Sequence, residues 1–69
     1  MSKFEIVVNG EKRTAGEGMT VEDFLTAHEV DPDVVVVERN GRILHRTAYA
    51  STPLAPDDAI EIVHFVGGG

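Results

Sequence analysis

The residues with the clearest chemical potential in this sequence are three consecutive glycines at its end, Gly67, Gly68 and Gly69. Glycine has no Cβ, so a run of glycines is thin and adopts backbone conformations closed to other residues. Such a segment can enter a narrow channel of a partner protein, where the carboxyl group of Gly69 is open to a phosphate electrophile or a sulfur nucleophile. A terminal glycine run can equally be a frayed end without a role. The chain offers no activating group of its own, so chemistry at Gly69 requires a partner.

Other reactive side chains do not form the groupings that catalysis or metal binding needs. The chain contains three histidines, His28, His45 and His64. They lie far apart in sequence and lack the paired spacing of structural zinc ligands. Glu61 and the pair Asp57-Asp58 have no nucleophile or base beside them in sequence, so we interpret them as turn or surface carboxylates. The sequence predicts no metal site and a protein that is not an enzyme.

The length and charge of the chain limit its function further. Its 69 residues allow one domain, and a domain of this size buries only about 60% of its unfolded surface, which leaves little room for a deep cleft. There is no cysteine, so apolar packing alone must stabilise the fold. The formal net charge of −6 argues against nucleic acid as a partner, because phosphates require clustered Lys and Arg. The same charge suits a basic partner protein.

The sequence also allows a prediction of where in the cell the protein is located. No basic segment followed by a long apolar run opens the chain, so we expect no signal peptide. The longest purely apolar run, residues 34–37, is far too short to cross a bilayer. A chain without cysteine fits the reducing cytoplasm. We therefore expect a soluble, cytoplasmic protein with no membrane contact.

The glycines need a rigid domain to hold them, and local patterns predict one. Residues 3–8 alternate as a half-buried strand, and Asn9-Gly10 predicts a hairpin to a returning strand over residues 11–15. Thr20 caps a helix, with Asp23 three residues on as a capping box. Val21, Phe24, Leu25 and His28 share one face of that helix. Pro32 ends it at the latest.

The second half of the chain predicts further strands. Residues 34–37 are β-branched on both faces, which indicates a strand inside the sheet or one whose second face is a docking surface. Asn40-Gly41 predicts another hairpin, an irregular segment follows over residues 46–53, and residues 60–66 form the last strand. One main helix packed on a mixed sheet makes a two-layer α+β domain.

The last strand predicts a recognition surface beside the glycines. Ile60 and Ile62 should pack on the helix, so Val63 and Phe65 point to the opposite face. An apolar patch of this kind is typical of a docking site, although single exposed apolar residues are also ordinary surface. The residues that we assign to a partner-docking surface are Val7, Val63, Phe65 and Val66.

The run from Asp58 to Gly69 resembles the C-terminus of the ThiS family, the sulfur carriers of thiamine biosynthesis. Further resemblance lies in residues 8–10, 20–21, 37–43 and 52–54, in the right order over nearly the whole chain. The resemblance implies a β-grasp, ubiquitin-like domain over residues 1–66 and a flexible tail over residues 67–69. The sequence departs from the family pattern at His45, Tyr49, Pro56 and Phe65. Phe65 stands next to the tail, where it can influence which partners are accepted.

The resemblance also implies a reaction at Gly69. An E1-like adenylating enzyme of the ThiF type uses Mg-ATP to convert the terminal carboxylate to an acyl-adenylate. Sulfur from a donor such as a cysteine desulfurase persulfide replaces AMP and gives a thiocarboxylate. A thiazole synthase of the ThiG type then takes that sulfur. The carrier itself binds no cofactor, and Gly67 and Gly68 carry Gly69 into the partner's channel.

Three alternatives remain beside this reading. A carrier of the same fold can serve another pathway, such as the synthesis of molybdopterin, cysteine or another sulfur metabolite. A ubiquitin-like modifier would form amide bonds to lysines through Gly69. A binding module would keep its function after deletion of Gly68 and Gly69.

Overall fold

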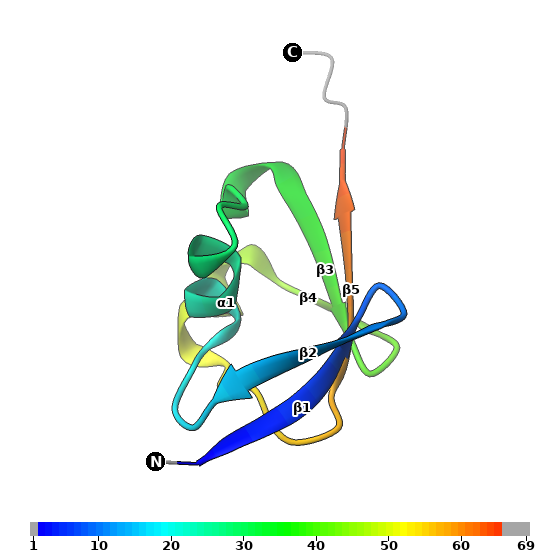
Figure 1. The fold of residues 1–69 in the computed structure, drawn as a ribbon. Coiled ribbons are helices and arrows are strands. Elements are labelled where there is room, and N and C mark those ends of the chain that lie inside the picture. The colour runs from blue at the N-terminus through cyan, green and yellow to red at the C-terminus, as the bar shows by residue number, and fades with distance from the viewer. Residues whose placement is uncertain (1, 66–69) are drawn as a thin grey trace.

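A computed structural model gives the structure of the chain and describes residues 2–65. Its elements are β1 (Lys3–Val8), β2 (Glu11–Gly16), α1 (Val21–Ala27), the 3-10 helix η1 (Pro32–Val34), β3 (Val35–Arg39), β4 (Arg42–Leu44), the 3-10 helix η2 (Arg46–Ser51) and β5 (Ala59–His64). The five strands form one sheet in the order β2-β1-β5-β3-β4 (Figure 1). The last strand, β5, runs parallel to β1 and antiparallel to β3. The predicted mixed sheet with one main helix is therefore confirmed.

Both predicted hairpins are present, and their turns have the backbone that the Asn-Gly pairs favour. Asn9 and Gly10 have φ values of 51° and 82°, and Asn40 and Gly41 have 54° and 84°. Two consecutive positive φ values are the mark of a type I′ turn, which matches the twist of the two strands it joins. The first turn fixes the register of β1 against β2, and the second does the same for β3 and β4.

The helix α1 begins and ends by local hydrogen bonding. The Thr20 hydroxyl accepts from the Asp23 N–H at 3.1 Å, and the Asp23 carboxylate accepts from the Thr20 N–H at 3.1 Å, so the predicted capping box is confirmed. At the other end Glu29 has a φ of 59°. Its N–H donates to the Thr26 carbonyl, and the Val30 N–H donates to the Leu25 carbonyl. This Schellman motif ends the helix well before Pro32.

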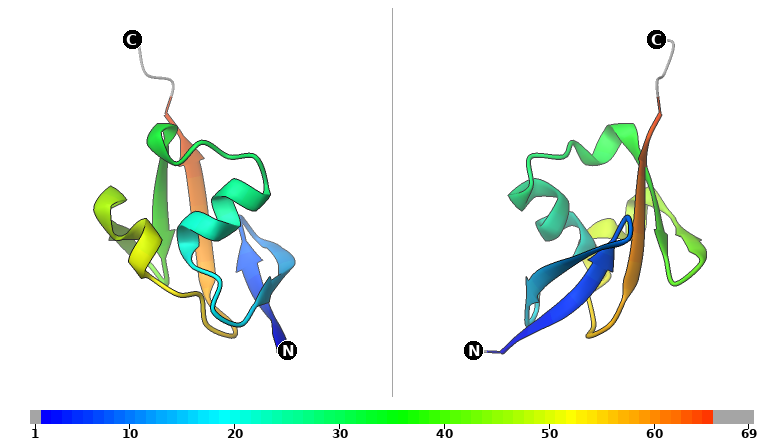
Figure 2. Two further views of the ribbon diagram at one scale, coloured as in Figure 1. Left: turned by 90° about the vertical axis from the view of Figure 1, so that its left-hand side faces the viewer. Right: turned by 45° about the vertical axis from the view of Figure 1, so that its right-hand side comes forward.

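The core lies between the sheet and the helical layer formed by α1 and η2 (Figure 2, left). The helix contributes Val21, Phe24 and Leu25 to it. The strands, η2 and the segment between η2 and β5 contribute the other buried residues, Ile6, Val8, Ala15, Val35, Val37, Tyr49, Leu54 and Ile60. The hydroxyl of Tyr49 donates to the Val35 carbonyl at 3.2 Å. Tyr49 thus closes one end of the core.

Several boundaries and placements differ from the sequence-based expectations. Residues 46–51 form a 3-10 helix rather than an irregular segment, and Val34 ends η1 instead of starting a strand. His28 shares the helix face of Phe24, as its spacing predicted, but the residue is exposed. Its exposed ring stacks on Phe24 with centroids 4.1 Å apart, because it follows the last turn of the helix. No helix within residues 2–65 is long and apolar enough to cross a membrane.

Candidate functional site

The strand that leads toward the glycines lies in the middle of the sheet, and it is held unequally on its two sides. Along β3, β5 is paired over five consecutive residue pairs, from Val35↔His64 to Arg39↔Ile60. Along β1 the pairing covers only Val7↔Ala59 and Val8↔Ile60. Backbone pairing to β1 therefore stops before the C-terminal half of β5.

The side chain of Asn9 continues this pairing beyond the end of β1. Its Oδ1 accepts from the Ile62 N–H at 2.8 Å, and its Nδ2 donates to the Ile62 carbonyl at 3.2 Å. The backbone N–H of Asn9 donates to the Ile60 carbonyl at 2.9 Å. A side-chain amide has the same donor and acceptor as a peptide group. Asn9 therefore acts as one more rung of the ladder and secures β5 at Ile62.

Asn40, in the other hairpin turn, secures the start of β5 in a similar way. Its N–H donates to the Ala59 carbonyl at 2.7 Å, and its Oδ1 accepts from the Ala59 N–H at 2.9 Å. Its Nδ2 donates to Asp58 Oδ1 at 3.0 Å. The strand that precedes the glycines is thus held at Ala59 and at Ile62 by asparagines that also make the two hairpin turns.

Asp58 joins this anchor to the core. Only 4% of the residue is exposed, and its Oδ2 accepts from Arg39 Nε at 3.0 Å and from the Ala55 N–H at 2.9 Å. Burial disfavours the charged form, but the hydrogen bonds from Asn40 and Ala55 and the Arg39 guanidinium outweigh it and lower the pKa of the carboxyl. Asp58 belongs to a turn, as interpreted, since its N–H donates to the Ala55 carbonyl at 3.1 Å, but its placement on the surface was wrong. It is a buried structural group, whereas Asp57 beside it is exposed.

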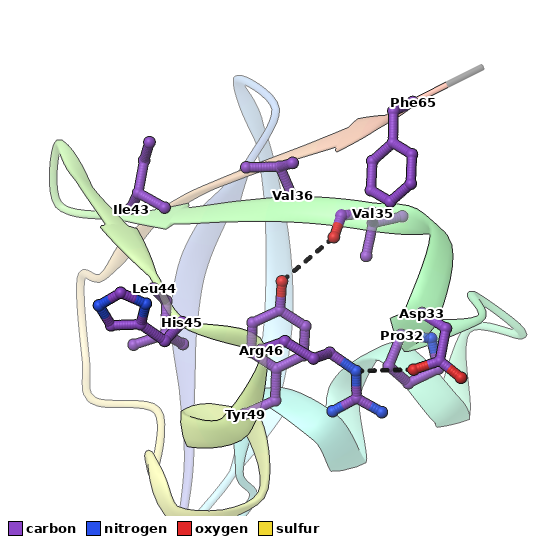
Figure 3. A pocket seen from close by; sticks show the side chains of 10 residues that line it. All are labelled: Pro32, Asp33, Val35, Val36, Ile43, Leu44, His45, Arg46, Tyr49 and Phe65. Carbon is purple, nitrogen blue, oxygen red and sulfur yellow. Dashed lines mark hydrogen bonds and ion pairs between the residues drawn. The ribbon is translucent and has the colours of Figure 1, made fainter. Parts of the chain in front are cut away.

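The face of the sheet opposite α1 carries a cluster of exposed apolar side chains, which we call the outer patch. Its members are Val34, Val36, Ile43, Val63 and Phe65, and they are all the large hydrophobic residues that are exposed within residues 2–65. Val36 lies directly across from Val63, and the Phe65 N–H donates to the Val34 carbonyl at 3.2 Å. Figure 3 shows Val36, Ile43 and Phe65 on the same side of β3. Since scattered single residues are the norm on a surface, this concentration makes the outer patch the candidate docking surface of the domain.

A groove of about 320 Å³ borders the outer patch at the free edge of β3 (Figure 3). Phe65, Val36 and Ile43 line its outer side, and Tyr49 lines it from the core side. Arg46 stands at its rim with Nε 2.9 Å from Asp33 Oδ1 and its guanidinium carbon 5.2 Å from the centre of the Tyr49 ring. The groove exists because β4 ends at Leu44, which leaves the beginning of β3 without a neighbour on that side.

The structure separates the residues that the sequence assigned to a docking surface. Val63 and Phe65 lie on the outer patch with 57% and 50% of their surface exposed. Val7 is half-buried beside Ala59, at the opposite end of β5 from Phe65. Val66 and the glycines 67, 68 and 69 lie outside the described residues. Within residues 2–65, no group of three or more His, Asp or Glu is placed to hold a metal.

The sequence left open that the second face of residues 34–37 is a docking surface, but Val34, Val36 and Ile43 were not among the residues assigned to the patch. The signal was the β-branched run of residues 34–37, which is apolar on both faces of its strand. One face, Val35 and Val37, is buried, and Val36 points to the other face. Val36 and Ile43 come onto one face with Val63 only through the pairing of β3 with β5 and β4.

Comparison with known proteins relates the chain to proteins of thiamine biosynthesis. It matches the family described as "ThiS family" over residues 4–69. It is 44% identical to "Sulfur carrier protein ThiS" of Bacillus subtilis over 50 residues, which are 72% of this chain and 76% of that protein. It is 43% identical over 65 residues to "Thiazole synthase" of Magnetococcus marinus, where the match covers 94% of this chain but only 20% of the relative.

A solved structure extends the comparison to the fold. The crystal structure of the thiamine biosynthesis protein ThiS from Geobacter metallireducens superposes with a TM-score of 0.82 at 36% identity, covering 96% of this chain and 100% of that one. The predicted β-grasp, ubiquitin-like fold is thereby confirmed.

Proposed function

Since the chain belongs to the ThiS family, which its match over residues 4–69 establishes, we propose that it is a sulfur carrier for thiamine biosynthesis. The name of the Bacillus subtilis relative supports this role. The thiazole synthases of Magnetococcus marinus and Paramagnetospirillum magneticum contain a segment similar to 94% of this chain. A carrier segment within a thiazole synthase supports such an enzyme as the sulfur acceptor.

The proposed reaction begins with the carboxylate of Gly69. An E1-like adenylating enzyme binds Mg-ATP, a carboxylate oxygen attacks the α-phosphorus, and pyrophosphate leaves to give an acyl-adenylate. The terminal sulfur of a persulfide, such as that of a cysteine desulfurase, attacks the acyl carbon and displaces AMP. A second thiol then cleaves the resulting S–S bond, which leaves the thiocarboxylate on Gly69 and a disulfide. The thiazole synthase takes up the sulfur.

In this proposal the chain provides the acyl group and the recognition surface, while its partners provide the catalysis. Adenylation supplies the leaving group that a carboxylate lacks, and the adenylating enzyme aligns the carboxylate with ATP and stabilises the developing charge. The chain has no catalytic role and holds no cofactor, because Mg-ATP binds to the activating enzyme. The proposal places these reactions in the cytoplasm, where ATP is available.

The single observation that carries the proposal, beside family membership, is the anchoring of β5. Asn9 bonds to the backbone N–H and carbonyl of Ile62, and Asn40 bonds to the backbone N–H and carbonyl of Ala59. A strand fixed in this way gives the residues that follow it a defined starting point on the domain. The outer patch adjoins that point at Phe65, so docking there would set the distance from the partner surface to Gly69.

The experiment that tests the proposal is the intact mass of the protein, prepared with Gly69 as its last residue. It is incubated with Mg-ATP, its adenylating enzyme, a cysteine desulfurase, cysteine and a thiol. The expected result is replacement of one oxygen by sulfur at Gly69. A control that lacks Gly68 and Gly69 should keep its mass. The proposal would be refuted if the mass of the full chain did not change although the same adenylating enzyme was shown to be active on another carrier. Conjugates of higher mass on lysines would identify a modifier instead.

A further inference from the structure

Two glutamates face each other in the middle of the outer face of the sheet. Glu38 of β3 lies directly across from Glu61 of β5 in the antiparallel register. Like charges at directly opposed positions destabilise a strand pair. Within residues 2–65 the ion pairs join Glu11 to Arg13, Arg39 to Asp58 and Arg46 to Asp33. None of these ion pairs includes Glu38 or Glu61.

The surroundings of this pair are apolar. Ile43 of β4 stands on the other side of Glu38. One step along the same face, Val36 lies across from Val63. Ile43 and Val63 are exposed by 67% and 57%. The two carboxylates thus lie within the outer patch, where a partner that covers the patch would take them out of water. Burying them without a countercharge would be costly.

We propose, on the basis of the proposed function, that the outer patch docks an adenylating enzyme whose surface places an arginine between Glu38 and Glu61 and apolar side chains against Val36, Val63 and Phe65. The planar guanidinium has donors on several sides, so one arginine can bond to both carboxylates. The formal net charge of −6 adds long-range attraction to a basic surface.

The geometry disfavours a second copy of this chain as the occupant. Two copies joined face to face through the outer patch would bring two Glu38–Glu61 pairs together. Like-charge juxtaposition across an interface is a device that suppresses wrong partners. The pair therefore selects a basic protein and keeps the apolar patch from self-association.

The distinguishing prediction is that the pair affects stability and binding in opposite directions. Glu61→Gln removes one of two like charges, so the unfolding midpoint should rise. The same variant should bind its adenylating enzyme about tenfold more weakly, because a charge-assisted contact is lost. Glu61→Lys should be at least as stable, since it faces Glu38, and should bind more weakly still. The matched control is Glu17→Gln, an exposed site between β2 and α1, which should leave both measurements unchanged.

Isothermal titration calorimetry with the adenylating enzyme at two salt concentrations, together with urea unfolding of each variant, provides the test. Weaker binding and higher stability for Glu61→Gln, with a smaller salt dependence of Kd, would support the proposal. Equal Kd values for Glu61→Gln and Glu17→Gln would overturn the proposed contact of an arginine with Glu38 and Glu61. If the wild type were still loaded with sulfur in that case, the proposed function would stand. A wild type that neither binds nor is loaded would overturn both. If sedimentation showed that the wild-type chain dimerises through the outer patch, the proposed docking of an adenylating enzyme there would also be overturned.

Discussion

The side-chain amide of Asn9 pairs with both polar backbone groups of Ile62, at 2.8 Å to its N–H and 3.2 Å to its carbonyl. These residues are 53 positions apart in sequence. One residue therefore forms the first hairpin turn with its backbone and holds the last strand with its side chain. The relationship makes the position of β5 depend on the first turn as well as on its neighbouring strands.

Removing this amide should release the C-terminal half of β5. Asn9→Gly keeps the positive φ of the turn and deletes only the side chain, so it isolates the contact better than alanine does. We expect a loss of about 1–2 kcal/mol in the free energy of unfolding, the net value of two hydrogen bonds. Native-state hydrogen exchange should show the Ile62 amide opening faster, while amides of α1 respond only to the global change. Unaltered protection at Ile62 would mean that Asn9 does not hold the strand.

The buried carboxylate of Asp58 should make stability depend on pH. Its folded pKa is lowered below the ordinary value, so it contributes stability above that value, and this contribution is lost as the pH falls through the folded pKa. Asp58→Asn should cost about 2 kcal/mol near neutral pH, and the gap to wild type should narrow below about pH 4. Urea unfolding across this range provides the measurement. Asp57→Asn, at the exposed neighbouring position, should show no such trend, and a constant gap for Asp58→Asn would contradict the assignment.

The end of α1 carries strain that glycine should relieve. Glu29 has a φ of 59° at the position after the helix cap, where glycine is the favoured residue. Glu29→Gly should raise the free energy of unfolding by about 0.5–1 kcal/mol, because the left-handed conformation carries no Cβ penalty in glycine. Glu29→Ala removes the same charge but keeps the Cβ and provides the control. Equal stability of the two variants would show that charge, not backbone strain, decides the effect.

Phe65 should matter for partner binding more than for folding. It is half exposed on the outer patch, so Phe65→Asp should leave the unfolding midpoint nearly unchanged. The rate of acyl-adenylate formation at a subsaturating concentration of carrier should fall about tenfold, as expected for a large apolar side chain that a partner buries on docking. Ser51→Asp, an exposed position on η2, serves as the control. A folded Phe65→Asp variant with the wild-type rate would show that the adenylating enzyme does not bind the outer patch.

Features set by near neighbours in sequence were predicted correctly. The two Asn-Gly turns and the capping box of Thr20 and Asp23 depend on a few consecutive residues, and the residue types state their role directly. The alternation of Ile60 and Ile62 with Val63 likewise gave the two faces of β5. The buried position of Ile60 and the exposure of Val63 follow that alternation.

Features that depend on the meeting of distant segments were not predicted. The residues next to Asp58 in sequence do not distinguish its carboxylate from that of exposed Asp57. Asp58 is buried because Arg39 and Asn40, which belong to the hairpin of β3 and β4, donate hydrogen bonds to it. The placement of Val7 away from Phe65 follows from the short parallel pairing of β1 with β5. The opposition of Glu38 and Glu61 is a consequence of strand register, and register is determined by the whole sheet.

The assignment of the chain as the sulfur carrier of thiamine biosynthesis is tested most directly by following one isotopically labelled sulfur atom. The chain is loaded at Gly69 with heavy sulfur, purified, and mixed with its thiazole synthase and the other substrates of that enzyme. We expect the label to appear in the thiazole product and the mass of the carrier to return to that of the carboxylate form. A thiazole without label, or a label that passes instead to molybdopterin or cysteine in the presence of their enzymes, would contradict the assignment to thiamine biosynthesis.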